Sequence, residues 1–355
     1  MNKKLVGLGL AAVAAVSLAA CGNRASKSSS SEASSSADTS VKAAIVTDIG
    51  GVDDRSFNQS AWEGLQEWGK AASLSKGNGY DYFHSASESD YITNLDSAVA
   101  GGYNLVFGIG FALESAIAEV APNNPNTHYV IVDSVVPDQD NVVSVGFADH
   151  EASYLAGVAA AKSTKTNHVG FIGGMEGVII DRFEAGFVAG AKSVNKDIKI
   201  TVDYAGSFGD AAKGQTLAAA QYAAGADVIF HASGGTGNGV FAAAKAENET
   251  RNEADKVWVI GVDRDQSAEG TYTSKDGKSS NFVLASTLKQ VGTSVKDIAT
   301  KAAAGDFPGG QVLQFSLKDK GVELAETNLS EDASKAVADA KQAILDGKVE
   351  VPEKP

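Results

Sequence analysis

The chain has 355 residues, enough for about two domains, and its 43% of hydrophobic residues is enough to build their cores. Thirty lysines and arginines face 44 aspartates and glutamates, and the resulting net charge of -14 disfavours a nucleic-acid binder. One cysteine excludes a disulfide framework, and five histidines without the His-Glu-x-x-His spacing argue against a zinc hydrolase. We expect neither a metal nor a cofactor.

The beginning of the chain has the pattern of a bacterial lipoprotein leader. Two lysines precede an apolar run over residues 5–20, which is too short for a comfortable membrane span. The chain's one cysteine, Cys21, follows Leu-Ala-Ala directly, as in a lipobox. We therefore expect residues 1–21 to be a signal peptide, and Cys21 to carry acyl chains that anchor the protein to the cell membrane on its extracytoplasmic face. The alternative is an ordinary signal peptide with a chance cysteine.

Residues 22–40 include nine serines and almost no large apolar side chain, so we expect a flexible tether. From residue 42 onward, short runs rich in β-branched residues alternate with alanine-rich stretches of helical spacing. The predicted strands of a first series are residues 43–48, 80–85, 104–110, 128–134 and 142–148. Those of a second series are residues 168–173, 199–205, 227–232, 257–263, 282–287 and 311–317.

This alternation predicts an α/β fold with two doubly wound, Rossmann-like lobes joined by a hinge. The first lobe is expected to comprise residues 41–148 and about 265–313, with the late strands 282–287 and 311–317 as candidates to return to it. The second lobe is expected to comprise residues 149–264 and about 314–355. Because ligands of such sheets bind beyond the carboxyl ends of the strands, the cleft between the lobes is the expected site.

The first predicted strand runs into the segment TDIGGVDDRSFN, residues 47–58. Asp48 stands at the carboxyl end of a buried strand, where an acid does not serve a core. Asp53 and Asp54 are better explained as caps of the following helix. Phe57 shares helical spacing with apolar residues of that helix, so a core role and a role in the cleft both stay open.

The second lobe has a similar segment at residues 203–210, in which Phe208 follows a strand and a glycine turn. Phe57 and Phe208 would sandwich a flat ring from opposite sides, unless Phe208 folds down as a lid on its own lobe. The glycine-rich residues 233–239 match neither a dinucleotide fingerprint nor a Walker loop. Asp263 ends another predicted strand, and its carboxylate either accepts sugar hydroxyls or caps the next segment. Lys289 either reaches the cleft or lies at a helix end.

Together with the lipobox, three segments resemble the basic membrane protein family. They are DIGGVDDRSFN at residues 48–58, YAGSF at 204–208 and GVDRD at 261–265. More narrowly, the chain resembles the purine-nucleoside receptor lipoproteins of Gram-positive bacteria, which are substrate-binding subunits of ABC importers. The resemblance runs from the leader to the C-terminus and implies a two-lobed type I periplasmic-binding fold and no enzymatic activity.

The resemblance also implies roles for particular residues. Phe57 and Phe208 would stack on the two faces of a purine, and Asp48 and Asn58 would bind the edge of the base. The residues implied for the ribose hydroxyls are Asp263, Lys289 and the backbone near Gly235, with Asp133 as a further candidate. The implied partners are a nucleoside such as adenosine, guanosine or inosine, and the permease and ATPase subunits of an ABC transporter. A monomer is expected.

Three other functions stay open on the sequence. A nucleoside hydrolase is the enzyme alternative, but residues 47–54 match its Asp-x-Asp-Pro-Gly-x-Asp-Asp calcium motif incompletely. A tethered receptor or adhesin would share the anchor and the cleft. A sugar or autoinducer binder of the same fold is the closest competitor. For such a binder, a second aromatic ring facing Phe57 would be less necessary than additional polar groups.

Overall fold

The computed structural model describes residues 41–355. The predicted lipidation site, Cys21, and the predicted tether at residues 22–40 lie outside the described residues. Each predicted strand is present, and its ends differ from the prediction by at most two residues. Among residues 41–355, no helix combines the length and the apolar character that crossing a membrane requires.

The first sheet has six strands in the order β13-β5-β4-β3-β1-β2, and all its neighbouring pairs are parallel. Its strands are β1 (Ala43–Thr47), β2 (Tyr80–Phe83), β3 (Leu105–Ile109), β4 (His128–Val132), β5 (Val142–Phe147) and β13 (Val312–Phe315). The expected doubly wound arrangement is confirmed, since each central strand is buried on both faces.

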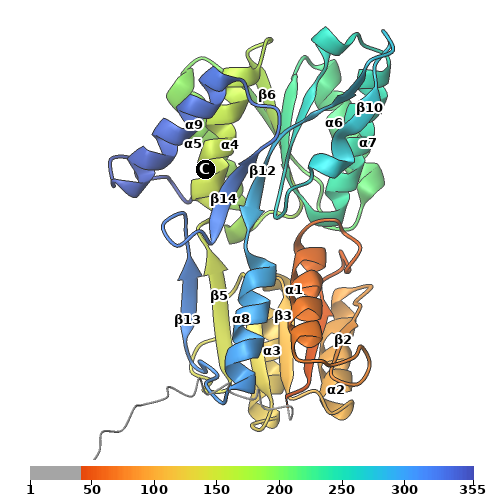
Figure 1. Ribbon diagram of the computed structural model, residues 1–355, viewed down its shortest axis with the longest axis vertical. Coiled ribbons are helices and arrows are strands. Elements are labelled where there is room, and N and C mark those ends of the chain that lie inside the picture. The colour runs from red at the N-terminus through yellow and green to blue at the C-terminus, as the bar shows by residue number, and fades with distance from the viewer. Residues whose placement is uncertain (1–40) are drawn as a thin grey trace, which may run out of the picture. The chain divides into compact units, whose positions relative to one another are not determined.

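Helices cover both faces of this sheet, and the alternation of side chains along β1 shows which helix meets which face. Ala43 and Ile45 pack with α1 (Phe57–Ala71) and α8 (Val291–Ala303). Ala44 and Val46 pack with α2 (Tyr91–Ala100) and α3 (Glu114–Val120). Figure 1 shows α8 lying beside α1, although more than 200 residues separate them in the sequence.

The second sheet also has six strands, in the order β14-β12-β9-β8-β6-β7. Its strands are β6 (His168–Gly173), β7 (Lys199–Tyr204), β8 (Val228–Ala232), β9 (Trp258–Gly261), β12 (Val283–Lys289) and β14 (Val322–Glu326). Only β14, which pairs with β12, is antiparallel. A separate two-stranded ribbon is formed by β10 (Thr271–Thr273) and β11 (Ser279–Asn281).

Helices cover the second sheet in the same way. On one face lie α4 (Asp149–Ser163) and α5 (Val178–Val194), and α9 (Glu331–Leu345) packs against α4. On the other face lie α6 (Ala211–Ala223) and α7 (Gly237–Glu249). We call the first sheet with its helices the first lobe and the second sheet with its helices the second lobe.

The predicted return of residues 282–287 to the first lobe is wrong. These residues form β12, which pairs with β9 and β14 inside the second sheet. Phe282 and Val283 belong to the core under α6 and α7, whereas Leu284 and Ala285 belong to the core under α5. A strand that is apolar on both faces needs an interior position, and the second sheet supplies it.

The part of the chain that returns to the first lobe is therefore α8 and β13, and not the whole of residues 265–313. The chain crosses between the lobes between β5 and α4, between β12 and α8, and between β13 and β14. Lys289, the last residue of β12, consequently stands at one of the crossings.

Candidate functional site

The carboxyl ends of strands from both sheets border one pocket. It encloses about 500 Å³ of space, a figure that includes its opening to solvent. Both lobes supply its lining: Asp48, Gly50, Asp54, Phe57, Asn58, Gly110, Phe111, Asp133, Ile179, Ile180, Phe183, Phe208, Ala232, Ser233, Gly234, Val262, Asp263 and Lys289.

Asp48, Asp54 and Asn58 form one polar group at the pocket wall, which we call the amide cluster. The Asp48 carboxylate accepts hydrogen bonds from the backbone N–H of Gly50 and from Asn58 Nδ2, both at 2.8 Å. Asp54 accepts the backbone N–H of Asn58 at 2.9 Å and its Nδ2 at 3.0 Å. Neighbouring carboxylates therefore share the Asn58 amide and fix its orientation.

The amide cluster presents acceptors with unused capacity. Asn58 Oδ1 is buried and finds no hydrogen-bond donor within residues 41–355. Burial raises the pKa of Asp48 to about 6, against the lowering effect of its hydrogen bonds from Gly50 and Asn58. A buried acceptor without a donor is costly, so Asn58 Oδ1 has capacity for one further hydrogen bond.

Asp133, Asp149, Asp263 and Lys289 form a second group, which we call the lysine cluster. Lys289 Nζ lies 2.6 Å from Asp133 Oδ2 and 3.1 Å from Asp149 Oδ1, and its side chain is only 3% exposed. Asp133 and Asp263 each follow the end of a strand with a positive φ, 68° and 67°, which few residues other than glycine adopt. The lysine joins carboxylates from both lobes, since Asp133 follows β4 of the first sheet and Asp149 begins α4 of the second lobe.

The charges of the lysine cluster depend on one another. Burial alone would lower the pKa of Lys289, but the three carboxylates together hold it well above its usual value. Burial raises the pKa of Asp263 to about 7, although Lys289 acts in the opposite direction. Asp133 Oδ1 is buried without a donor in the described part of the chain, so this cluster too has an acceptor open to a ligand.

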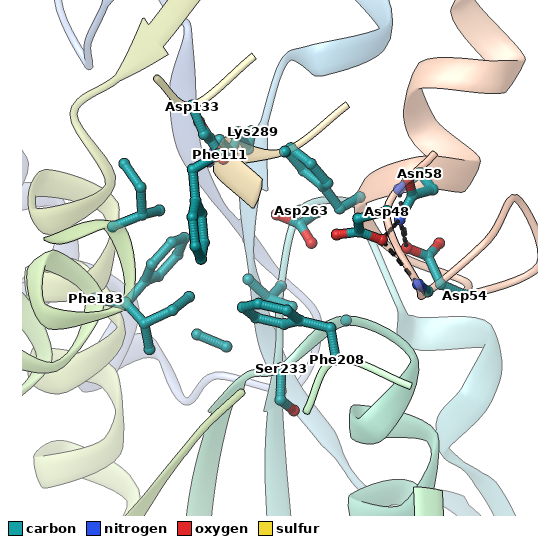
Figure 2. Close-up of a pocket in the computed structure, with 18 residues that line it drawn as sticks. Asp48, Asp54, Asn58, Phe111, Asp133, Phe183, Phe208, Ser233, Asp263 and Lys289 are labelled. Atoms are coloured by element: carbon teal, nitrogen blue, oxygen red, sulfur yellow. Dashed lines mark hydrogen bonds and ion pairs between the residues drawn. The ribbon is translucent and has the colours of Figure 1, made fainter. Parts of the chain in front are cut away.

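Aromatic and aliphatic side chains form the remaining walls. The ring of Phe208 meets the ring of Phe111 edge-on, with centroids 5.9 Å apart. Lys289 Nζ lies over the rings of Phe57 and Phe183, 5.1 and 5.6 Å from their centroids. Figure 2 shows Phe183 on one side of the pocket, Phe208 between the walls, and the amide cluster on the opposite side.

The structure brings most of the predicted site residues to this pocket: Asp48, Phe57, Asn58, Asp133, Phe208, Asp263 and Lys289. Gly235 is not part of the lining, whereas Ser233 and Gly234 are. A side chain at Gly235 would come within 3.2 Å of the Phe208 carbonyl oxygen, which places this glycine behind Phe208. The ligand-binding roles of all these residues remain predictions.

The predicted capping role is confirmed for Asp54 and not for Asp53. The Asp54 carboxylate accepts the backbone N–H groups of Ser56, Asn58 and Gln59 at the beginning of α1. Asp53 is exposed. Asp54 also lines the pocket, which the sequence argument did not anticipate.

Other pocket residues were missed altogether. Phe111 follows β3 after Gly110, whose φ is 111°, so it shares the strand–glycine–phenylalanine pattern of Phe208 and could have been found. Phe183 lies within α5, where its apolar spacing is the same as that of a core residue. Asp149 was missed as well: it is not part of the pocket lining and begins α4 as an ordinary helix-terminal acid would, but it is 1% exposed beside Lys289.

The calcium motif considered for a hydrolase has a different arrangement in the structure. Within residues 41–355, no group of three or more His, Cys, Asp or Glu side chains is placed to hold a metal ion. Asp48 and Asp54 instead accept hydrogen bonds from backbone N–H groups and from Asn58.

Comparisons with known proteins agree with this architecture. Residues 41–355 match the family described as ABC transporter substrate-binding protein PnrA-like. A protein of Lactococcus lactis subsp. cremoris (strain MG1363), named ABC transporter nucleoside-binding protein BmpA, is 58% identical over 355 residues and all of both chains. A Listeria monocytogenes protein named CD4+ T-cell-stimulating antigen is 52% identical over 360 residues, again all of both chains.

Solved structures share the fold at lower sequence identity. An ABC transporter solute-binding protein from Aeropyrum pernix K1 aligns with a TM-score of 0.76 and 23% identity, over 88% of this chain and 94% of its own. A sugar transporter from Clostridium phytofermentans aligns with a TM-score of 0.58 and 16% identity, over 81% and 99%. These likenesses confirm the two-lobed type I periplasmic-binding fold. With the family match over residues 41–355, they show that the chain belongs to the PnrA-like family of ABC transporter substrate-binding proteins.

Proposed function

We propose that this protein is a membrane-anchored receptor that captures purine nucleosides between its two lobes and delivers them to an ABC permease. The observation that carries the proposal is the combination found in one pocket. Aromatic rings from both lobes border it together with buried acceptors that lack donors, Asn58 Oδ1 at one side and Asp133 Oδ1 at the other. A nucleoside offers a flat base with N–H donors at its edge and a sugar with O–H donors.

The base is assigned to the amide cluster and the rings. Phe57 and Phe208 come from opposite lobes, so a base lying between them would gain a stacking surface on each face. The ring of Phe208 must then exchange its edge contact with Phe111 for the base. Asp48 and Asn58 supply acceptors to N–H groups at the base edge, and a ligand without those donors would leave them unpaired.

The ribose is assigned to the lysine cluster. Asp263 and Asp133 offer carboxylate oxygens to the sugar hydroxyls, and Lys289 offers N–H donors. Gly234 takes the place that the sequence suggested for Gly235, because it lines the pocket and allows the ligand to approach the backbone.

Capture requires the lobes to separate and close again. A ligand that touches both lobes stabilises the closed arrangement, and the closed surface is what a permease can distinguish. None of these side chains is assigned a chemical step, so we propose a binding protein and not an enzyme. Cys21 is the proposed lipid attachment site, and a monomer facing the outside of the cell membrane is the proposed working form.

Capture is tested by differential scanning fluorimetry of the purified protein with adenosine, guanosine, inosine, cytidine, adenine and ribose. We expect the purine nucleosides to raise the melting temperature most, since adenine and ribose each fill one half of the pocket and cytidine has a smaller base. Chromatography of the ligand after incubation should return the intact nucleoside. Free base with ribose would instead establish a hydrolase, and stabilisation by ribose or other sugars alone would establish a sugar binder.

Delivery and anchoring are tested in cells. Uptake of radiolabelled guanosine should fall when the gene for this protein is deleted and should return with the unaltered chain. A Cys21→Ala variant should be released from the membrane fraction. Unchanged uptake after deletion would leave a receptor without a transport role, and membrane retention of the variant would rule out Cys21 as the anchor.

A further inference from the structure

Ser56 occupies the position before α1 at which a serine side chain ordinarily caps the helix. A capping serine accepts a backbone N–H from the first turn, but the Ser56 side chain makes no such bond. The Asp54 carboxylate takes those N–H groups instead, from Ser56, Asn58 and Gln59. The Ser56 hydroxyl is therefore available for another partner.

That partner lies in the other lobe. Ser56 Oγ–H donates a hydrogen bond to Asp263 Oδ2, across 207 positions of sequence. Both side chains are buried, Ser56 completely and Asp263 to within 7%. Figure 2 shows the Asp263 carboxylate pointing into the pocket beside Asp48.

Two further bonds attach the same turn to the lobe of Asp263. The Arg55 carbonyl accepts a hydrogen bond from Gln266 Nε2 at 3.0 Å, and the Asp54 carbonyl accepts one from Asn238 Nδ2 at 3.4 Å. Gln266 is itself held, because its Oε1 accepts the backbone N–H of Val262 at 2.9 Å. The Arg55 side chain also forms an ion pair with Glu269 of the second lobe, so the turn is connected to that lobe at four points.

We propose that Ser56 is a positioning residue for ribose recognition. Its hydroxyl fixes one oxygen of Asp263 and leaves the other acceptor positions of that carboxylate to the sugar. Since Ser56 belongs to the first lobe, this pair exists only when the lobes are together, which makes ribose recognition depend on closure. The inference rests on the proposed nucleoside function and assigns to it a residue that does not itself line the pocket.

The test compares calorimetric affinities of the full-length protein for guanosine and for 2′,3′-dideoxyguanosine, which lacks the 2′ and 3′ hydroxyls of the ribose and keeps the 5′ hydroxyl. We expect Ser56→Ala to weaken guanosine binding about tenfold and dideoxyguanosine binding much less, since a buried carboxylate loses one donor. Ser56→Thr retains a hydroxyl and should restore most of the difference. Ser144→Ala is the matched control, because Ser144 is equally buried and accepts one hydrogen bond, from the Val136 N–H, away from the pocket.

A double-mutant cycle separates positioning from general loss of structure. If Ser56 acts through Asp263, then Ser56→Ala should add little to the effect of Asp263→Asn on guanosine affinity. If the losses of guanosine affinity in Ser56→Ala and Asp263→Asn add up in the double variant, the inference is overturned. It is also overturned if Ser56→Ala prefers guanosine over 2′,3′-dideoxyguanosine as strongly as the unaltered protein does. If Ser56→Ala does not fold, the same preference measured in Ser56→Thr and Ser56→Cys decides, and an unchanged preference in the poorly donating cysteine variant overturns it. Failure of the unaltered protein to bind any nucleoside would instead refute the proposed function and this inference with it.

Discussion

Both the amide cluster and the lysine cluster contain buried aspartates, but the first surrounds them with neutral hydrogen-bond donors and the second with a cation. In the amide cluster, Asp48 has backbone and amide donors but no cation, and burial raises its pKa to about 6. In the lysine cluster, three carboxylates surround Lys289 and stabilise its positive charge. Buried aspartates can thus be stabilised as hydrogen-bond acceptors in two ways, by hydrogen bonds from neutral donors or by a cation that several of them share.

The two clusters should therefore respond differently when a substitution removes a partner of their aspartates. Removing a neutral donor from the amide cluster changes which protonation state is favoured, and the network can adjust by taking up a proton. Removing the cation from the lysine cluster leaves several buried carboxylates without compensation, which is far more costly.

The largest expected effect comes from Lys289→Met. Replacing the cation should lower the free energy of unfolding by about 3–5 kcal/mol, the cost of breaking a buried ion pair from one side. Urea denaturation followed by tryptophan fluorescence measures it. Lys296→Met is the control, because its Nζ lies 3.0 Å from Glu67 in an exposed pair, for which a loss of about 0–1 kcal/mol is expected. Equal losses in the two variants would contradict the role given to the lysine cluster.

The next effect is a pH dependence that belongs to Asp48. Its pKa is about 6 in the folded protein and near 3.8 when unfolded, so the folded state holds a proton that the unfolded state has already released between these values. Stability of the ligand-free protein therefore falls as pH rises through this window, by up to about 3 kcal/mol from this group.

Asp48→Asn cannot lose a proton and should flatten that part of the profile. Urea midpoints measured from pH 4 to pH 8 for both proteins give the difference directly. Parallel profiles would show that Asp48 titrates as an ordinary exposed carboxylate and would place it outside the buried network.

A smaller effect is expected from the ring of Phe208. Phe208→Ala should weaken guanosine binding by about 1–3 kcal/mol, the contribution of one aromatic ring stacked on a base. Phe307→Ala is the matched control, since Phe307 stacks on His128 at 4.1 Å and is not part of the pocket lining. Unchanged guanosine affinity in a folded Phe208→Ala protein would refute the stacking arrangement.

The finest comparison is one of ligand preference. Asp263→Asn should reduce guanosine affinity by about tenfold and leave guanine affinity almost unchanged, because the lost acceptor faces the sugar. Asp48→Asn should weaken guanosine and guanine alike. Calorimetry of both variants with both ligands gives the four values. The same loss for guanine and guanosine in Asp263→Asn would move this residue away from the ribose.

The sequence predicted the interior strands well because their apolar runs are buried on both faces. It missed β14 (Val322–Glu326), an edge strand in which only Val322 is fully buried, and the polar three-residue strands β10 and β11. It also assigned β12 to the wrong sheet. The apolar pattern of a strand predicts that the strand is buried, but it does not predict which strands lie beside it.

The site residues that are easiest to predict from the sequence pattern are those that follow strand ends. Asp48, Asp133 and Asp263 stand at such positions, and the structure brings them to one pocket. Phe183 could not be found in this way, because a helix residue that faces a pocket has the same spacing as one that faces a core. The bond between Ser56 and Asp263 depends on lobe geometry, which no local pattern contains.

The most direct test of divided recognition is calorimetric titration of the unaltered protein with guanosine, 2′,3′-dideoxyguanosine and guanine. If the amide cluster binds the base and the lysine cluster binds the ribose, guanosine should bind tightest and each of the other two at least about tenfold more weakly. Guanine binding as tightly as guanosine would contradict a role for the lysine cluster in recognition. No binding of guanosine, adenosine or inosine, with tight binding of a free sugar, would contradict nucleoside capture itself.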